Sequence, residues 1–275
     1  MNDVLRIEDT GAVRTLTLHR PQARNALDGE LVSALFRALE EADADGEVRA
    51  IVLTGTDPAF CAGVDLKQAA AEGVAYFRRF EEENCVARVA ECRTPVVCAV
   101  NGHAFTGGLE IVLGCDVVLA SDRAVFADTH VRVGVLPGGG LTARLPQLVG
   151  PAWARRMSMT GEIVDARLAE RIGLVTEIVQ HEDLLRRAGE IAAAVAEVPA
   201  PAMTALKRIY TEGNASIIDR ALAIESSIAS RASDPGGVEN RYRDVAERNR
   251  ERVASRSREG VTPRPREADL NSASE

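Results

Sequence analysis

The sequence lacks any long apolar run, because no stretch approaches the ~18 consecutive apolar residues that a helix needs to cross a bilayer. Residues 1–6 also lack the basic start and the apolar core of a secretory signal. We therefore expect neither a membrane anchor nor a signal peptide.

Cysteine is scarce, and its spacing suggests no cross-links. The five cysteines are odd in number and lie mostly in apolar surroundings. They fit neither a disulfide framework nor a paired metal site, and no His/Cys/Asp cluster has the spacing of metal ligands. We therefore expect a reducing cytoplasm and no metal. The cysteines are Cys61, Cys85, Cys92, Cys98 and Cys115.

Positive charge is in deficit, with 33 basic residues against 41 acidic ones and a net charge of −8. A nucleic-acid-binding protein needs clustered lysine and arginine to neutralise phosphates, so this class is excluded. One segment, 239–258, has seven arginines and four acids. It is interpreted either as a solvated helix with i,i+4 ion pairs or as a helix that meets an anionic ligand.

Strand and helix patterns alternate through the first two-thirds of the 275 residues. This alternation predicts crossover units and a mainly parallel sheet covered by helices, an α/β fold. After residue 151 helical patterns dominate, with one possible strand at 174–179, and the alanine-rich helices suit close packing or a subunit interface. Strand patterns cover 13–18, 49–54, 96–100 and 116–120. A first helix pattern begins at Asp28, and further helix patterns cover 74–91, 152–160, 165–172, 182–197, 200–212 and 217–231.

The most informative segment runs from Asn101 to Leu113. A buried strand ends there, glycines allow a turn, and a helix begins. The first N–H groups of a helix lack internal partners and can stabilise an oxyanion. Glu110 lies between Leu109 and Ile111 on this apolar helix, and burial would raise its pKa toward the range useful for proton transfer. The alternative is a structural carboxylate paired with an arginine.

A second loop, Gly55–Lys67, follows another strand in the same way. Small residues at Cys61, Ala62 and Gly63 would let a backbone N–H reach a bound carbonyl oxygen. Two such donors from two strand ends would form an oxyanion hole, although on its own this segment could be a plain surface loop.

These residues resemble the enoyl-CoA hydratase/isomerase (crotonase) superfamily from the N-terminal strand to about Arg231. The resemblance rests on many ordered matches at the family's spacing. The matching residues are Arg20-Pro21, Asn25-Ala26-Leu27, Phe60–Leu66, Pro95-Val96, Val100-Asn101-Gly102, Gly107–Glu110, Cys115-Asp116, Phe126, Gly134, Pro137–Gly140, Leu145-Pro146 and Thr160-Gly161-Glu162.

The resemblance implies the ClpP/crotonase fold, a spiral of repeated β-β-α units followed by a helical region that trimerises. We accordingly predict an acyl-CoA-binding core at 1–195, a C-terminal helical region at 196–258 and a disordered tail at 259–275. The family also implies a homotrimer or a hexamer built as a dimer of trimers.

The implied ligand is an acyl-CoA thioester, so that coenzyme A is part of the substrate and no separate cofactor is expected. By resemblance, the backbone N–H groups of Ala62 and Gly107 would hold the thioester oxygen. The path of the CoA nucleotide and pantetheine would be lined by Arg24, Ala26 and Leu27 together with Val64, Asp65 and Leu66.

The chain departs from the family at the second catalytic glutamate. Glu110 matches the first, but the residue four positions after Phe126 is His130. The gap-free match to Gly134 and Pro137 supports this register. An imidazole also exchanges protons near neutral pH, and a nearby Glu110 would raise its pKa. A structural histidine is the alternative.

The leading hypothesis is a carbon–oxygen lyase of fatty-acid metabolism that hydrates a 2-enoyl-CoA, with Glu110 activating water and His130 protonating Cα. His130 also motivates a second hypothesis, in which the same site isomerises, decarboxylates or hydrolyses an acyl-CoA. A third is a non-catalytic acyl-CoA binder. The residues expected to wall the acyl pocket, 74–80 and 136–141, are apolar and indicate an apolar chain or ring.

Overall fold

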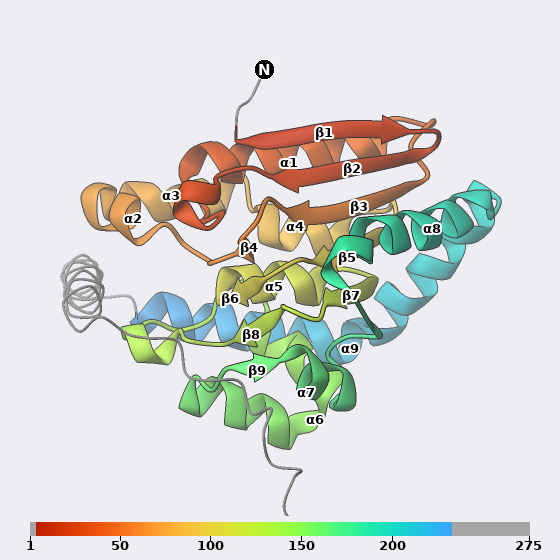
Figure 1. Cartoon of the computed structure of the whole chain (residues 1–275). Helices are drawn as coiled ribbons and strands as arrows, with labels where there is room; N and C mark the ends of the chain where they lie inside the picture. Colours follow the sequence, from red (N-terminus) through yellow and green to blue (C-terminus); the bar gives the residue numbers. More distant parts are fainter. Residues whose placement is uncertain (1–3, 233–275) are drawn as a thin grey trace, which may run out of the picture.

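Two β-sheets organise the fold, seen in the computed structural model, which describes residues 4–232 (Figure 1). The six-stranded sheet is parallel except for the hairpin of β1 and β2; the four-stranded sheet is parallel except for β9. In order, the first contains β1 (Leu5–Thr10), β2 (Val13–Leu18), β3 (Ala50–Gly55), β5 (Val96–Val100), β7 (Val117–Ser121) and β10 (Glu177–Val179). The second contains β4 (Ala59–Cys61), β6 (His103–Phe105), β8 (Val125–Ala127) and β9 (Val164–Asp165).

The strands enter these sheets in consecutive pairs. β3 continues into β4, β5 into β6 and β7 into β8, so each pair gives one strand to each sheet before the chain turns into helices. This is the β-β-α spiral that the family resemblance implied, and the prediction is confirmed. The paired strand ends place the loops after β4, β6 and β8 next to one another.

Helices cover both faces of the larger sheet, and successive apolar side chains of its buried strands point to opposite faces. In β3, Ile51 and Leu53 face a core formed with α1, α4 and α5, whereas Ala50 and Val52 face α8. The helices of this part of the chain are α1 (Gly29–Ala44), α2 (Leu66–Glu72), α3 (Val74–Glu82), α4 (Cys85–Glu91), α5 (Gly107–Gly114), α6 (Leu141–Thr160), α7 (Ala166–Arg171) and α8 (Leu184–Glu197).

The helix predicted over 74–91 is wrong in its continuity. α3 ends at Glu82, and α4 starts after Asn84, whose side chain accepts a hydrogen bond from the Ala87 N–H. Asparagine at this position supplies an N-cap, so a separate helix begins after it.

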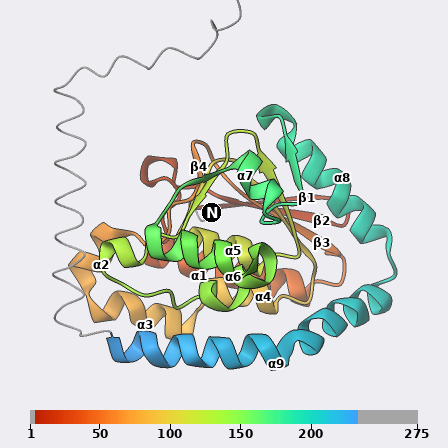
Figure 2. The same ribbon diagram turned by 90° about the horizontal axis from the view of Figure 1, so that it is seen from below.

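Beyond α8, one long helix, α9 (Ala200–Ala232), replaces the two helices predicted at 200–212 and 217–231. It runs along one side of the molecule (Figure 2) and packs against α6. Lys207 connects it to the turn before β7, since its ammonium group lies 2.7 Å from the Asp116 carboxylate. The arginine-rich segment 239–258 and the tail 259–275 lie outside the described residues, and the domain boundaries stay predictions.

Between residues 4 and 232, no helix combines the length and apolarity that crossing a membrane requires.

Candidate active site

Glu110 lies in the first turn of α5, where the helix follows directly on β6. Its side chain is buried, and its Oε1 accepts a hydrogen bond of 2.8 Å from the Gly139 N–H. Burial raises the pKa of Glu110 because an apolar environment disfavours the ionised form. The carboxylate is thus a stronger base than a solvated one.

His130 follows β8 and faces Glu110, as the sequence register predicted. Its Nε2 lies 4.0 Å from Glu110 Oε2, and the imidazole is almost fully buried. Burial lowers the pKa of His130, but the hydrogen bond to Asp128 and the charge of Glu110 outweigh it, so the net shift is upward. A protonated imidazole is therefore favoured beside the carboxylate.

Asp128 supports this histidine and was missed by the sequence analysis. Its Oδ1 lies 2.7 Å from His130 Nδ1 and accepts a second hydrogen bond, of 3.1 Å, from the His130 N–H. Burial opposes ionisation of Asp128, yet the hydrogen bond and charge of His130 bring its pKa below the ordinary value. Because a carboxylate only accepts hydrogen bonds, Nδ1 carries the proton and Nε2 faces Glu110.

The loop after β4 and the start of α5 are in backbone-to-backbone contact. Gly63, with φ of +88°, has space for no side chain: a Cβ would clash with the Thr106 side chain and lie 3.2 Å from the Gly107 nitrogen. A Cβ on Gly108 would lie 2.1 Å from the Cys61 carbonyl oxygen. Glycines here allow the two segments to meet, as an oxyanion hole with one N–H donor from each of them requires.

Gly107 is the first residue of α5, so its N–H has no carbonyl one turn earlier to bond. The N–H of Ala62, in contrast, donates a 3.1 Å hydrogen bond to the Arg24 carbonyl. This occupied donor corrects the choice of Ala62 as the second oxyanion donor. The Val64 N–H has no acceptor among residues 4–232, and its nitrogen lies 3.9 Å from where a Cβ on Gly107 would stand. Val64 and Gly107 thus present the adjacent unpaired amides.

The structure brings together the two segments predicted to line the CoA path. Leu27 and Val64 form a parallel bridge, in which the Leu27 N–H donates to the Gly63 carbonyl and the Asp65 N–H to the Leu27 carbonyl. Arg24 is exposed, Ala26 is buried, and the Leu27 side chain is fully buried, so Leu27 offers a ligand neither its side chain nor a free N–H.

The side chain of Asp65 is already engaged in structure. It accepts hydrogen bonds from the first amides of α2 and lies 3.1 Å from the Arg20 guanidinium. Val64 and Leu66 are half-buried and pack with Tyr76 and Phe77 of α3 in a small apolar cluster. This cluster includes part of the expected apolar wall at 74–80.

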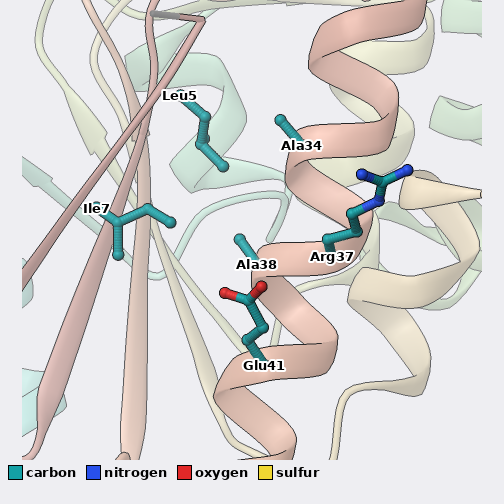
Figure 3. Close-up of a pocket in the computed structure, with 6 residues that line it drawn as sticks. All are labelled: Leu5, Ile7, Ala34, Arg37, Ala38 and Glu41. Atoms are coloured by element: carbon teal, nitrogen blue, oxygen red, sulfur yellow. The ribbon is translucent and has the colours of Figure 1, made fainter. Parts of the chain in front are cut away.

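A separate pocket of about 190 Å³ lies between β1 and α1 (Figure 3). It contains none of the predicted site residues and is not part of the candidate active site. The pocket is lined by Leu5, Ile7, Ala34, Arg37, Ala38 and Glu41.

Among the described residues, no three His, Cys, Asp or Glu side chains are grouped to hold a metal ion.

Comparison with known proteins gives consistent matches over most of the chain. The family model described as enoyl-CoA hydratase/isomerase matches residues 8–240. A probable peroxisomal enoyl-CoA hydratase of Arabidopsis thaliana is 32% identical over 87% of this chain and 90% of its own length. A short-chain-enoyl-CoA hydratase of Clostridium acetobutylicum is 35% identical over 82% and 87%. The crystal structure of enoyl-CoA hydratase from Mycobacterium tuberculosis H37Rv superposes with a TM-score of 0.77 at 44% identity, covering 84% of this chain and 99% of that one.

Proposed function

Because the chain belongs to the enoyl-CoA hydratase/isomerase family, we propose that it is a lyase that adds water across the 2,3 double bond of an enoyl-CoA thioester. The observation that carries the proposal is the buried pair of Glu110 and His130, 4.0 Å apart between Nε2 and Oε2. A single water molecule placed about 2.8 Å from each group spans such a gap.

In the proposed reaction, ionised Glu110 takes a proton from this water while the oxygen of the water bonds to Cβ. The π electrons move toward the thioester oxygen, where the N–H groups of Gly107 and Val64 stabilise the enolate. His130 then donates the Nε2 proton to Cα. Transfer of the proton from Glu110 back to His130 through the next water restores both groups.

Asp128 favours a second candidate, hydrolysis of the thioester. A carboxylate hydrogen-bonded to Nδ1 also strengthens an imidazole as a base toward water at Nε2. In that reaction the water would attack the carbonyl carbon and the CoA thiolate would leave. Isomerisation and decarboxylation use the same enolate and remain alternatives because His130 replaces the family's glutamate.

Assays on intact protein separate these reactions. Hydration of crotonyl-CoA removes the absorbance of the conjugated enoyl thioester without releasing thiol, whereas hydrolysis releases CoA that a thiol reagent detects. Malonyl-type and 3-enoyl thioesters report decarboxylation and isomerisation. Tight binding of acyl-CoA without turnover of any thioester would contradict the enzymatic proposal and favour a binding protein.

We propose further that no metal or separate cofactor takes part, that the acyl group is apolar, as in fatty-acid metabolism, and that the protein works in the cytoplasm. The apolar cluster around Tyr76 and Phe77 supports an apolar acyl group. The five cysteines are all free thiols, which suits a reducing compartment.

We also propose a homotrimer, or a hexamer of two trimers, because α9 exposes an apolar stripe. The stripe recurs at spacings of four and seven residues, so its members share one helix face. It consists of Leu206, Tyr210, Ile217, Ile224 and Ile228. A contiguous exposed apolar face of this kind is typical of a subunit interface.

A further inference from the structure

Glu225 of α9 is buried, at 7% exposed, and its carboxylate accepts hydrogen bonds from residues at the start of α6. Its Oε1 accepts a 2.7 Å hydrogen bond from the Gly140 N–H. Its Oε2 accepts one of 2.7 Å from the Thr142 N–H and another from the Thr142 hydroxyl. The carboxylate therefore caps α6, whose own N-cap residue, Gly140, has no side chain to do so.

The same turn holds the candidate base. The Gly139 N–H donates to Glu110 and the next N–H, that of Gly140, donates to Glu225. Two carboxylates from α5 and α9 thus bind consecutive amides of one turn. Both positions of the turn require glycine, because Gly140 has φ of +99° and a Cβ on Gly139 would lie 2.6 Å from Glu110 Oε2.

We propose that Glu225 is a positioning residue for Glu110, which fixes the Gly139–Gly140 turn and so makes the geometry of the proton-transfer pair depend on the docking of α9. This inference rests on the proposed role of Glu110 as the base. It assigns to the C-terminal helix a function inside the active site of its own chain.

The charges around Glu110 determine in which direction its pKa should change when Glu225 is replaced. Besides burial, His130 lowers and Glu225 raises the pKa of Glu110, and Glu225 also raises the pKa of His130. Asp128 holds His130 from the other side, and Arg144 of α6 faces both glutamates and donates to the Gly139 carbonyl. Removing the charge of Glu225 should therefore lower the pKa of both reacting groups.

The test compares Glu225→Gln with Lys207→Met, a control that breaks another anchor of the same helix far along the chain. In E225Q we expect kcat for crotonyl-CoA to fall on the order of tenfold, with KM within about twofold, because misplaced groups react slowly while binding is retained. Both limbs of the pH profile of kcat should move to lower pH. K207M should lower the melting temperature and leave the limbs in place.

The conservative variant Glu225→Asp keeps the charge on a shorter side chain. It should leave the pH limbs near those of the wild type while kcat stays reduced. A wild-type kcat and pH profile in folded E225Q, or a change equal to that in K207M, overturns the inference. If E225Q does not fold, Glu225→Asp takes its place as the test, and a wild-type kcat in that variant has the same meaning.

A readout without turnover separates this inference from the proposed function. In protein labelled with ¹³C at glutamate carboxyls, the Glu110 signal is identified by its absence from Glu110→Gln. Its titration midpoint should lie at lower pH in E225Q than in the wild type, and an equal midpoint contradicts the inference. If the wild type hydrates no enoyl thioester, the proposed function fails, yet this titration still tests the link between Glu225 and Glu110.

Discussion

The imidazole of His130 is held between two carboxylates, with Nδ1 2.7 Å from Asp128 Oδ1 and Nε2 4.0 Å from Glu110 Oε2. The two distances differ in meaning. The short one is a hydrogen bond that fixes the ring, whereas the long one leaves space for a reacting molecule. Nδ1 therefore orients the ring through Asp128, and Nε2 is the nitrogen that can exchange a proton with a substrate or water.

We expect Glu110→Gln to lower kcat for crotonyl-CoA by about a hundredfold or more, because the amide cannot accept the proton of the attacking water. The variant keeps the size of the side chain and its acceptor for the Gly139 N–H. Steady-state hydration assays with matched circular dichroism spectra measure the effect. Full activity in a folded variant would remove Glu110 from the mechanism.

The same variant should be more stable than the wild type at neutral pH. The folded-state pKa of Glu110 is raised by burial, so the unfolded chain ionises it more readily. The native state therefore loses stability as pH rises above the unfolded value near 4.3, and the loss is complete above the folded value. Glu110→Gln lacks this loss. Urea unfolding at several pH values should show a gap that opens with rising pH, and a constant gap would contradict the assigned direction.

Asp128→Asn should shift the alkaline limb of the pH profile to lower pH. The hydrogen bond and charge of Asp128 raise the pKa of His130, so their loss makes the imidazole release its proton earlier. Because His130 is the proposed acid, kcat at neutral pH should fall on the order of tenfold. His130→Gln is the companion variant: it should lose the alkaline limb altogether. An unmoved limb in Asp128→Asn would indicate a purely structural Asp128.

Local patterns in the sequence were sufficient for five strands of the main sheet and for singling out Glu110, whereas β1 carried no recognised pattern and Gly107 was proposed through the family resemblance. A carboxylate within an apolar helix and a glycine turn after a buried strand are visible within a dozen residues. Strands β4, β6 and β8 carry no such signal before the family is considered, because each is only three residues long and too short to display alternation. The second sheet became predictable only through the family resemblance.

Residues whose roles depend on distant pairing were not predictable. Ala62 and Val64 both adjoin Gly63, and which of their amides is occupied depends on the carbonyl of Arg24, far away in the sequence. The role of Asp128 could be recognised only once the orientation of the His130 ring was known. Glu225 meets Gly140 across 85 positions of the chain, and no short-range pattern in α9 marks it.

The choice between Val64 and Ala62 is testable by replacing one backbone amide with an ester. Substituting Val64 by its α-hydroxy acid removes the N–H and keeps the side chain, and we expect the activation barrier to rise by about 3 kcal/mol. The same change at Ala62 removes the hydrogen bond to Arg24 and should cost about 1 kcal/mol of stability with little effect on kcat. The opposite pattern would restore Ala62 as the oxyanion donor.

The apolar stripe of α9 gives the final prediction, on assembly. Ile217 is 55% exposed at the middle of the stripe, and Ile217→Asp places a charge where a partner subunit would bury it. The wild type should sediment as three or six chains of 29.4 kDa and the variant as a monomer. Leu185→Asp on α8 alters a side chain that is equally exposed, at 53%, but outside the stripe, and should keep the wild-type mass. Because Glu225 lies on the same helix as Ile217, the monomer should also lose activity beyond what Leu185→Asp loses. A monomeric wild type would contradict the proposed assembly, and an Ile217→Asp variant of unchanged mass would place the interface elsewhere.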